Sequence, residues 1–307
     1  LGSDAEGTPR VRPTGPKDAD IARWRAALDG DQRAIRDEVR SLLQRECFRT
    51  FREPEMSAYR EQVLSWCREL SGLSVIRRLG TPGASTNIAD FVGAFETLSL
   101  FDLSLVVKFG VQFGLFGGAI QNLGTEGHHA LLPEVARCEL LGCFAMTERA
   151  HGSNVRGLQT VARYEPADQQ FVITTPNLAA GKEWIGNAAQ HGRLAVVFAQ
   201  LETQGESYGV HAWLVPIRDS AGNLLPGVRA EDCGQKMGLN GVDNGRLWFD
   251  GVRVPREALL DRFGQVAPDG TYSSPIPSAG KRFFAMLGTP EGGRINVAAG
   301  ALAASKA

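Results

Sequence analysis

The pattern of apolar and polar positions divides the chain into a helical first part and a strand-rich second part. Before residue 140, apolar residues recur at helical spacing, as in Val63, Trp66 and Leu70. A later segment places Phe91 and Phe95 on one stripe, which we interpret as core without a ligand role. The apolar segment 103–123 contains charged and polar residues and several glycines, which favours a buried helix over a membrane span.

From about residue 141, short runs of β-branched and aromatic residues alternate with turn residues. Six or more short strands with antiparallel spacing predict a sandwich or barrel. The pattern predicts strands at residues 142–147, 158–164, 170–175, 194–201, 209–215 and 246–249. A helical pattern returns at Pro290 and continues without a stop signal.

The predicted fold class is therefore α+β, with an N-terminal helical domain, an antiparallel β-sandwich or barrel domain, and the start of a C-terminal helical bundle. The predicted divisions are a disordered tail at 1–17, the helical domain at 18–140, the β-domain at 141–262, a loop excursion at 263–289 and the first helix of a truncated C-terminal domain at 290–307.

Charge and composition exclude several classes of function. A formal net charge of −1 over 307 residues argues against affinity for nucleic acid or for an anionic membrane. The five cysteines are odd in number and form no C-x-x-C pair, which predicts reduced thiols in a cytoplasmic protein rather than disulfides or zinc. The five histidines form no cluster with ligand spacing, so no metal site is predicted. No glycine motif of a dinucleotide fold or P-loop is present.

Two segments carry more specific chemistry. Residues 143–154 read CFAMTERAHGSN, a strand end followed by a loop whose N–H groups and hydroxyl suit a phosphate or the polar edge of a flavin. A β-turn with a capping serine has the same composition. Residues 181–188 read GKEWIGNA, where an indole can lie against a flat ring. A core tryptophan beside a turn is the alternative there.

Together with longer strings, these segments resemble the acyl-CoA oxidase and acyl-CoA dehydrogenase superfamily, most closely the oxidases. The oxidase pattern T-E-x-x-H-G-[ST] followed by R-G-L matches residues 147–158, and A-Q-L-x-T-Q-G-E-x-Y-G-x-H-A matches residues 199–212. M-D-N-G is close to residues 242–245, and P-D-G-T-Y is present at residues 268–272. The resemblance covers the chain from about residue 30 to its end.

The resemblance implies that FAD binds between the β-domain and a C-terminal bundle, usually across a dimer. Thr147 is expected to bond the flavin edge, Trp184 and Ile185 to pack on the ring, and Gly186 to contact it through its backbone. The implied cofactor-binding residues are Met146, Thr147, Gly152, Ser153, Trp184, Ile185 and Gly186, and the implied substrate-binding residues are Ser153, Glu291 and Arg294.

The resemblance also implies a reaction, the FAD-dependent oxidation of acyl-CoA to trans-2-enoyl-CoA with oxygen as acceptor and hydrogen peroxide as product. The flavin takes a hydride from the β-carbon while a base removes the α-proton. The family's base is a glutamate of the C-terminal bundle, so we assign no catalytic residue here and give Glu148 a structural role. Dehydrogenases commonly carry threonine where this chain has Gly186, and we hypothesise that the missing side chain leaves room for oxygen.

Three alternatives stay open. The chain could belong to a dehydrogenase that passes electrons to a flavoprotein, or it could act on an acyl group held by a carrier protein. Arg149 and Ala150 depart from the family pattern, which leaves the contacts on the pantetheine side of the substrate open. It could also be a non-catalytic partner subunit, since fold resemblance does not establish activity. The expected partners are the acyl-CoA substrate and either a second copy or a chain that carries the C-terminal helical domain.

Overall fold

The computed structural model describes residues 18–306, apart from the side chains of residues 288–292. The tail predicted at 1–17 lies outside the described residues. The α-helices are α1 (Asp18–Asp29), α2 (Arg33–Leu42), α3 (Met56–Glu69), α4 (Ser74–Leu79), α5 (Ile88–Ser99), α6 (Leu103–Phe109), α7 (Gly118–Leu123), α8 (Glu126–His129), α9 (Leu132–Ala136), α10 (Ala279–Met286) and α11 (Gly288–Ala304). Short 3₁₀ turns cover Gly30–Gln32, Glu46–Phe48, Leu70–Gly72, Val155–Gly157, Leu178–Ala180 and Arg256–Ala258.

Side-chain caps fix where the central helices begin. The Asn87 side chain accepts hydrogen bonds from the first backbone N–H groups of α5, and Asp102 accepts one from the Leu105 N–H at the start of α6. Such caps satisfy N–H groups that have no partner inside the helix.

The predicted apolar segment forms one long helix in which α6 and α7 are joined by a π-helix, η4 (Gly110–Gly117). Among the described residues, Leu103–Leu123 alone is long and apolar enough to cross a membrane by length and composition. Two thirds of its most apolar window is buried inside the protein (67%). It therefore packs as a core helix, with Phe109, Phe113 and Phe116 in the main hydrophobic core.

The strands form a mixed six-stranded sheet in the order β1-β5-β2-β3-β9 with β6 also paired to β5, an antiparallel sheet β4-β8-β7, and the small pair β10-β11. They are β1 (Gly142–Ala145), β2 (Val161–Glu165), β3 (Gln170–Thr174), β4 (Lys182–Ile185), β5 (Leu194–Thr203), β6 (Glu206–Pro216), β7 (Val228–Asp232), β8 (Gly245–Phe249), β9 (Val252–Pro255), β10 (Gln265–Val266) and β11 (Tyr272–Ser273).

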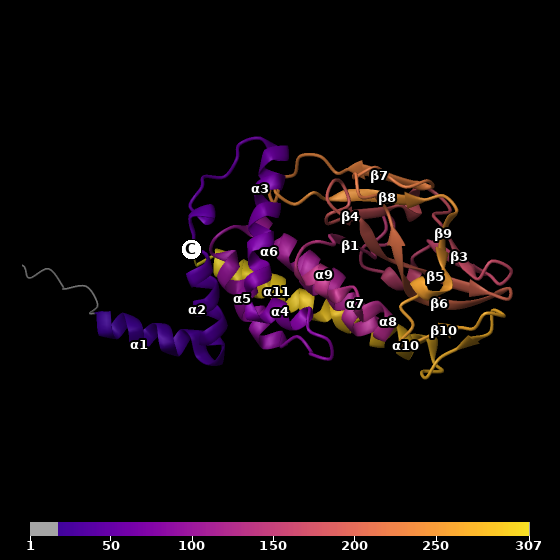
Figure 1. Ribbon diagram of the computed structural model, residues 1–307, viewed down its shortest axis with the longest axis horizontal. Helices are drawn as coiled ribbons and strands as arrows, with labels where there is room; N and C mark the ends of the chain where they lie inside the picture. The colour runs from indigo at the N-terminus through magenta and orange to yellow at the C-terminus, as the bar shows by residue number, and fades with distance from the viewer. Residues whose placement is uncertain (1–17, 307) are drawn as a thin grey trace, which may run out of the picture.

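The predicted order of a helical part followed by a β part is confirmed (Figure 1). Two pairings differ from the predicted antiparallel spacing, because β1 and β2 both run parallel to β5. A parallel pair needs a long connection between its strands, and other strands and loops supply it in both cases.

Strand β5 lies between two hydrophobic cores and is buried on both faces. Val196 and Phe198 pack with the helices, whereas Val197 and Leu201 point to the core between the two larger sheets. A strand covered on both faces reads as a continuous apolar run rather than as an alternating one, which explains the sequence LAVVFA.

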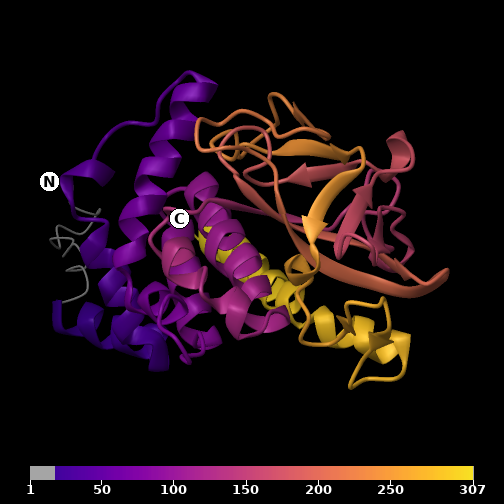
Figure 2. The same ribbon diagram turned by 45° about the vertical axis from the view of Figure 1, so that its right-hand side comes forward.

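Helix α11 runs from the β10–β11 end of the molecule back into the helical part, against α5 and η4 (Figures 1 and 2). It begins at Gly288, two residues before the predicted start. Its other side carries exposed apolar residues, among them Ile295 and Leu302.

Candidate functional site

The loop after β1 lies beside β4 and brings three predicted site residues together. The Thr147 hydroxyl donates a hydrogen bond to the Glu183 carbonyl oxygen at 2.9 Å, and the Glu183 N–H donates to the Thr147 carbonyl oxygen at 3.1 Å. Trp184 and Ile185 come next in β4, so this pairing places them beside Thr147.

Trp184 is held in an unusual backbone conformation with its indole exposed. Its φ is +62°, which aromatic residues rarely adopt. Asn244 Nδ2 donates to the Trp184 carbonyl oxygen at 3.1 Å, and the β4–β8 register shifts between Lys182 and Ile185. The indole is 58% exposed, whereas Ile185 is 2% exposed. An exposed, fixed aromatic side chain offers a flat apolar face to a ring-shaped ligand.

Gly186 lies where the β part meets η4. A Cβ atom at this position would lie 2.8 Å from Val111 Cγ2, closer than real Cβ contacts allow. Val111 also lines an apolar cavity in the helical part. The space that a side chain at position 186 would need is thus occupied by Val111, so packing alone accounts for the glycine. The hypothesis that its missing side chain admits oxygen stays a prediction.

Gly152 and Ser153 lie on the surface part of the same loop, and both are exposed. The loop is anchored by hydrogen bonds from the Arg149 and Ala150 N–H groups to backbone oxygens of residues 181 and 179. A Cβ atom at Gly152 would meet nothing within 4 Å. The backbone around these two residues is therefore accessible to a ligand.

Glu148 is a buried structural residue, as the sequence predicted. Its carboxylate accepts hydrogen bonds from the Gln159 and Thr160 N–H groups at 2.7 and 2.8 Å and from Lys182 Nζ at 3.1 Å. Burial would raise the pKa of Glu148, but Lys182 and these donors hold it below its usual range. Burial lowers the pKa of Lys182 to about 8, although Glu148 opposes that shift. Lys182 Nζ also donates to the carbonyl oxygen of the buried Met146.

The predicted substrate residues Glu291 and Arg294 belong to α11, which packs against α5 and η4. The Arg294 side chain is exposed, and no described contact joins it to Thr147 or Trp184. Glu291 belongs to the first turns of α11, and its side chain is outside the described residues.

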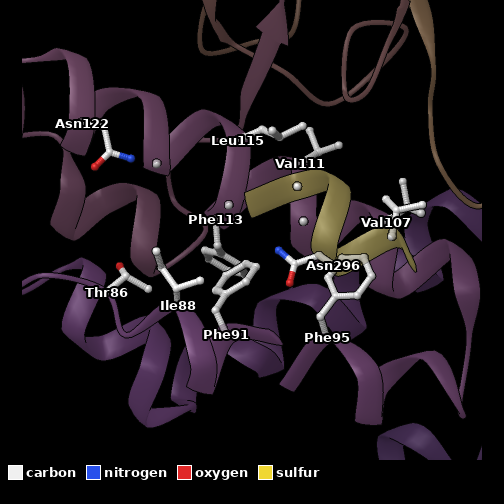
Figure 3. Close-up of a pocket in the computed structure, with 15 residues that line it drawn as sticks. Thr86, Ile88, Phe91, Phe95, Val107, Val111, Phe113, Leu115, Asn122 and Asn296 are labelled. Atoms are coloured by element: carbon white, nitrogen blue, oxygen red, sulfur yellow. The ribbon is translucent and has the colours of Figure 1, made fainter. Parts of the chain in front are cut away.

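A cavity of about 180 Å³ lies between α5, η4 and α11 (Figure 3). The stripe interpreted as core, Phe91 and Phe95, forms part of its wall. Their rings occupy the space that side chains at Gly114 and Gly110 would need, with 3.1 and 2.9 Å to the nearest ring atoms. The sequence signal for this cavity is the row of glycines in the apolar segment, which on its own indicates only a buried helix.

Comparison with known proteins identifies the class. The family model described as acyl-CoA dehydrogenase, middle domain, matches residues 143–252, from β1 to the start of β9. Residues 143–252 thus match this middle domain, and the predicted resemblance of the chain to the acyl-CoA oxidase and acyl-CoA dehydrogenase superfamily is confirmed.

The similar proteins are acyl-CoA oxidases. Peroxisomal acyl-coenzyme A oxidase 2 of Arabidopsis thaliana is 51% identical over 68% of this chain, and an acyl-coenzyme A oxidase-like protein of Mus musculus is 52% identical over 69%. The structure of acyl-CoA oxidase 1 from Yarrowia lipolytica matches 95% of this chain and 42% of its own, with 30% identity and a TM-score of 0.81. The chain spans about a third of the length of these curated relatives (31% and 33%).

Proposed function

We propose that this chain supplies the helical and middle parts of an FAD-dependent acyl-CoA oxidase, which forms trans-2-enoyl-CoA and hydrogen peroxide. The observation that carries this proposal is the contact between Gly186 and Val111. Through this contact, the strand that presents Trp184 ends against the wall of the apolar cavity. A ring ligand on the indole and an acyl chain in the cavity would thus be held by adjoining elements.

The residues present fit a flavin. The Thr147 hydroxyl hydrogen is taken by the Glu183 carbonyl oxygen, so the Thr147 oxygen is left to accept a bond from a ring N–H. The exposed indole of Trp184 would cover one face of the flavin ring, and the buried residues Ile185 and Met146 would lie beneath the indole. Gly186 would contact the flavin through its backbone. FAD, when bound, accepts the hydride from the β-carbon of the thioester.

The accessible loop at Gly152 and Ser153 suits the phosphate groups of FAD or of the substrate. Arg294 and Glu291 are proposed to hold the CoA part of an acyl-CoA, or the corresponding part of a carrier-bound thioester. The structure of Caenorhabditis elegans acyl-CoA oxidase 2 is described as bound with FAD, ascaroside-CoA and ATP, at 28% identity and a TM-score of 0.67.

The base that removes the α-proton is proposed to lie outside this chain, in a C-terminal helical domain. Glu148 is unsuitable because its carboxylate is buried and already paired with Lys182. The exposed apolar side of α11, with Ile295 and Leu302, supports a covering bundle or a second copy of the chain. We propose the domain divisions given by the sequence, with α11 as the first helix of that bundle.

The proposed location is a reducing intracellular compartment. The sequence predicted the cytoplasm, and the five free cysteines agree with a reducing environment. Four relatives, from Arabidopsis and human, carry the word peroxisomal in their names. A fluorescent fusion of the full-length protein distinguishes the two compartments.

The test uses the full-length protein that contains this chain. Its visible spectrum should show a flavin, which octanoyl-CoA bleaches without oxygen and which air restores with release of peroxide. Reoxidation by a flavoprotein acceptor but not by air would assign a dehydrogenase instead. A protein that binds no flavin and copurifies with a second polypeptide would assign a non-catalytic subunit and overturn the proposal.

Trp184→Ala should lower the flavin content of the full-length protein by at least about tenfold, since stacking on an aromatic ring is lost. Trp24→Ala is the matched control, because Trp24 is equally exposed (64%) but lies on α1. Equal flavin content in both variants would contradict the assignment of Trp184.

A further inference from the structure

Asn296 of α11 is a buried polar residue whose side-chain oxygen is unpaired within the described part of the chain. The residue is 7% exposed, and its Oδ1 atom is buried without a hydrogen-bond partner. It lines the cavity between α5, η4 and α11, and Figure 3 shows its amide pointing from α11 toward Phe91 and Phe113. A buried acceptor without a partner costs free energy, so the fold alone does not explain an asparagine here.

The surroundings of Asn296 are apolar. Phe95, Val107 and Val111 form walls, and none of the residues that line the cavity is ionisable. At the far end, the Thr86 hydroxyl already donates to Gln121 Oε1 at 3.1 Å. Of the polar side chains that line the cavity, Asn296 is the one with a buried oxygen that lacks a partner within the described part of the chain, so this oxygen can take a donor from a bound molecule.

We propose that this cavity binds an acyl segment that carries a hydroxyl group, and that the hydroxyl donates to Asn296 Oδ1. The acyl part of this statement rests on the proposed function. An ammonium or a carboxylate would be buried here without a counter-charge, which is far more costly than burying a hydroxyl. A hydroxyl satisfies the acceptor, and its own oxygen can accept a hydrogen bond from the Asn296 amide.

The size of the cavity limits the segment. At about 180 Å³ it is slightly larger than engineered cavities of about 150 Å³ that hold benzene. The bound segment therefore has about six to eight heavy atoms.

Binding to this chain tests the site independently of any activity. Benzyl alcohol and ethylbenzene have the same number of heavy atoms and differ by a hydroxyl in place of a methyl group. The ratio of their dissociation constants is measured by ligand-observed NMR for the wild type, Asn296→Leu and Thr86→Val. Asn296→Leu should shift the ratio toward ethylbenzene by about tenfold, and Thr86→Val should leave it within about twofold.

Thermal unfolding of the same variants separates a ligand site from a structural role. Asn296→Leu should keep or raise the melting temperature, because it removes an unsatisfied buried acceptor. An unchanged ratio in Asn296→Leu, or a shift in Thr86→Val alone, would overturn the proposal. So would a bound water that stays at Asn296 when benzyl alcohol is present.

Turnover by the full-length protein then tests the acyl part. Hydroxyoctanoyl-CoA isomers and octanoyl-CoA are compared, and at least one isomer should lose about tenfold in kcat/KM relative to octanoyl-CoA when Asn296 is replaced by leucine. If no acyl-CoA is oxidised while the binding ratio still depends on Asn296, the proposed function fails and the hydroxyl site stands. If the wild type and Asn296→Leu oxidise every thioester with the same kcat/KM, the proposed hydroxyl site is wrong and the proposed oxidase function is retained.

Discussion

His211 shows how the burial of one side chain makes the stability of this chain depend on pH. Its ring is 1% exposed, with Nδ1 3.0 Å from the Gly209 carbonyl oxygen and Nε2 2.9 Å from the Tyr272 hydroxyl. The carbonyl can only accept, so Nδ1 donates to it and Nε2 accepts from Tyr272. Burial favours the neutral ring and lowers the pKa of His211 to about 4.

The stability of the chain should therefore fall as the pH falls from about 6.5 to 4. In that range the histidine takes up a proton in the unfolded chain but not in the folded one, which lowers the free energy of unfolding by about 3 kcal/mol. His211→Gln should weaken this dependence by a similar amount, as measured by urea unfolding at pH 7 and pH 4.5. His129→Gln controls for the loss of a histidine. If the wild type and His211→Gln lose the same stability between pH 7 and pH 4.5, other titrating groups dominate the pH dependence.

At this scale, resemblance to a family could single out some residues of the proposed sites and not others. Thr147 and Trp184 belong to long strings of characteristic residues, so resemblance could single them out. Asn296 could not be found in this way, because its burial depends on α5 and η4, which are remote in sequence and meet only in the folded chain.

The contact between β1 and η4 shows how closely two elements approach. Gly142 begins β1, and a Cβ atom there would lie 2.2 Å from the ring of Phe116. The Gly142 N–H also donates to Gln112 Oε1 at 3.0 Å. Strand and helix are thus fixed together by a glycine and a buried amide.

Gly142→Ala should destabilise the chain by about 2–3 kcal/mol, because the Phe116 ring is fully buried and has little room to move. Gly127→Ala in α8, where a Cβ atom would meet nothing within 4 Å, should be neutral or slightly stabilising. Chemical denaturation of both variants makes the comparison. Similar stabilities would mean that β1 moves away from η4 at little cost.

Strands that bury apolar residues and expose polar ones could be predicted from the sequence, whereas β4 could not. Strand β5 is a long β-branched run and was predicted close to its true bounds. In β4, Lys182 is fully buried while Trp184 is exposed, which reverses the polarity that a strand prediction relies on. Strands β7 and β9 were also missed, since charged residues interrupt both of them (VRAED and VRVP) and leave no apolar run.

At the scale of the whole molecule, a buried polar cluster joins the helical and β parts. Lys108 Nζ of α6 donates to Asn187 Oδ1 at 2.7 Å and to Asp243 Oδ1 at 2.8 Å, and it lies 2.9 Å from His191 Nδ1. Lys108 and Asp243 have fully buried side chains. Burial would raise the pKa of Asp243, but Lys108 and His191 hold it far below its usual range.

Lys108→Met should lower the free energy of unfolding by about 3–5 kcal/mol, because it leaves the Asp243 carboxylate buried without its main counter-charge. Hydrogen exchange should accelerate first around residues 187–191 and 240–245, where the β part meets α6. Glu202→Gln, which breaks an exposed pair with Arg163, should cost less than about 1 kcal/mol. Equal losses in both variants would show that the cluster does not couple the two parts.

The π-helix η4 has a consequence for how this cavity can change over evolutionary time. Its hydrogen bonds reach five residues back, one more than in an α-helix, so η4 contains one residue more than an α-helical segment needs. Deleting a single codon there would let the segment become α-helical and would change which η4 side chains face the cavity, while α7 keeps its orientation because the wider π-helical turn had absorbed the extra residue. Gain or loss of one residue can thus change what the cavity accepts without any amino-acid substitution.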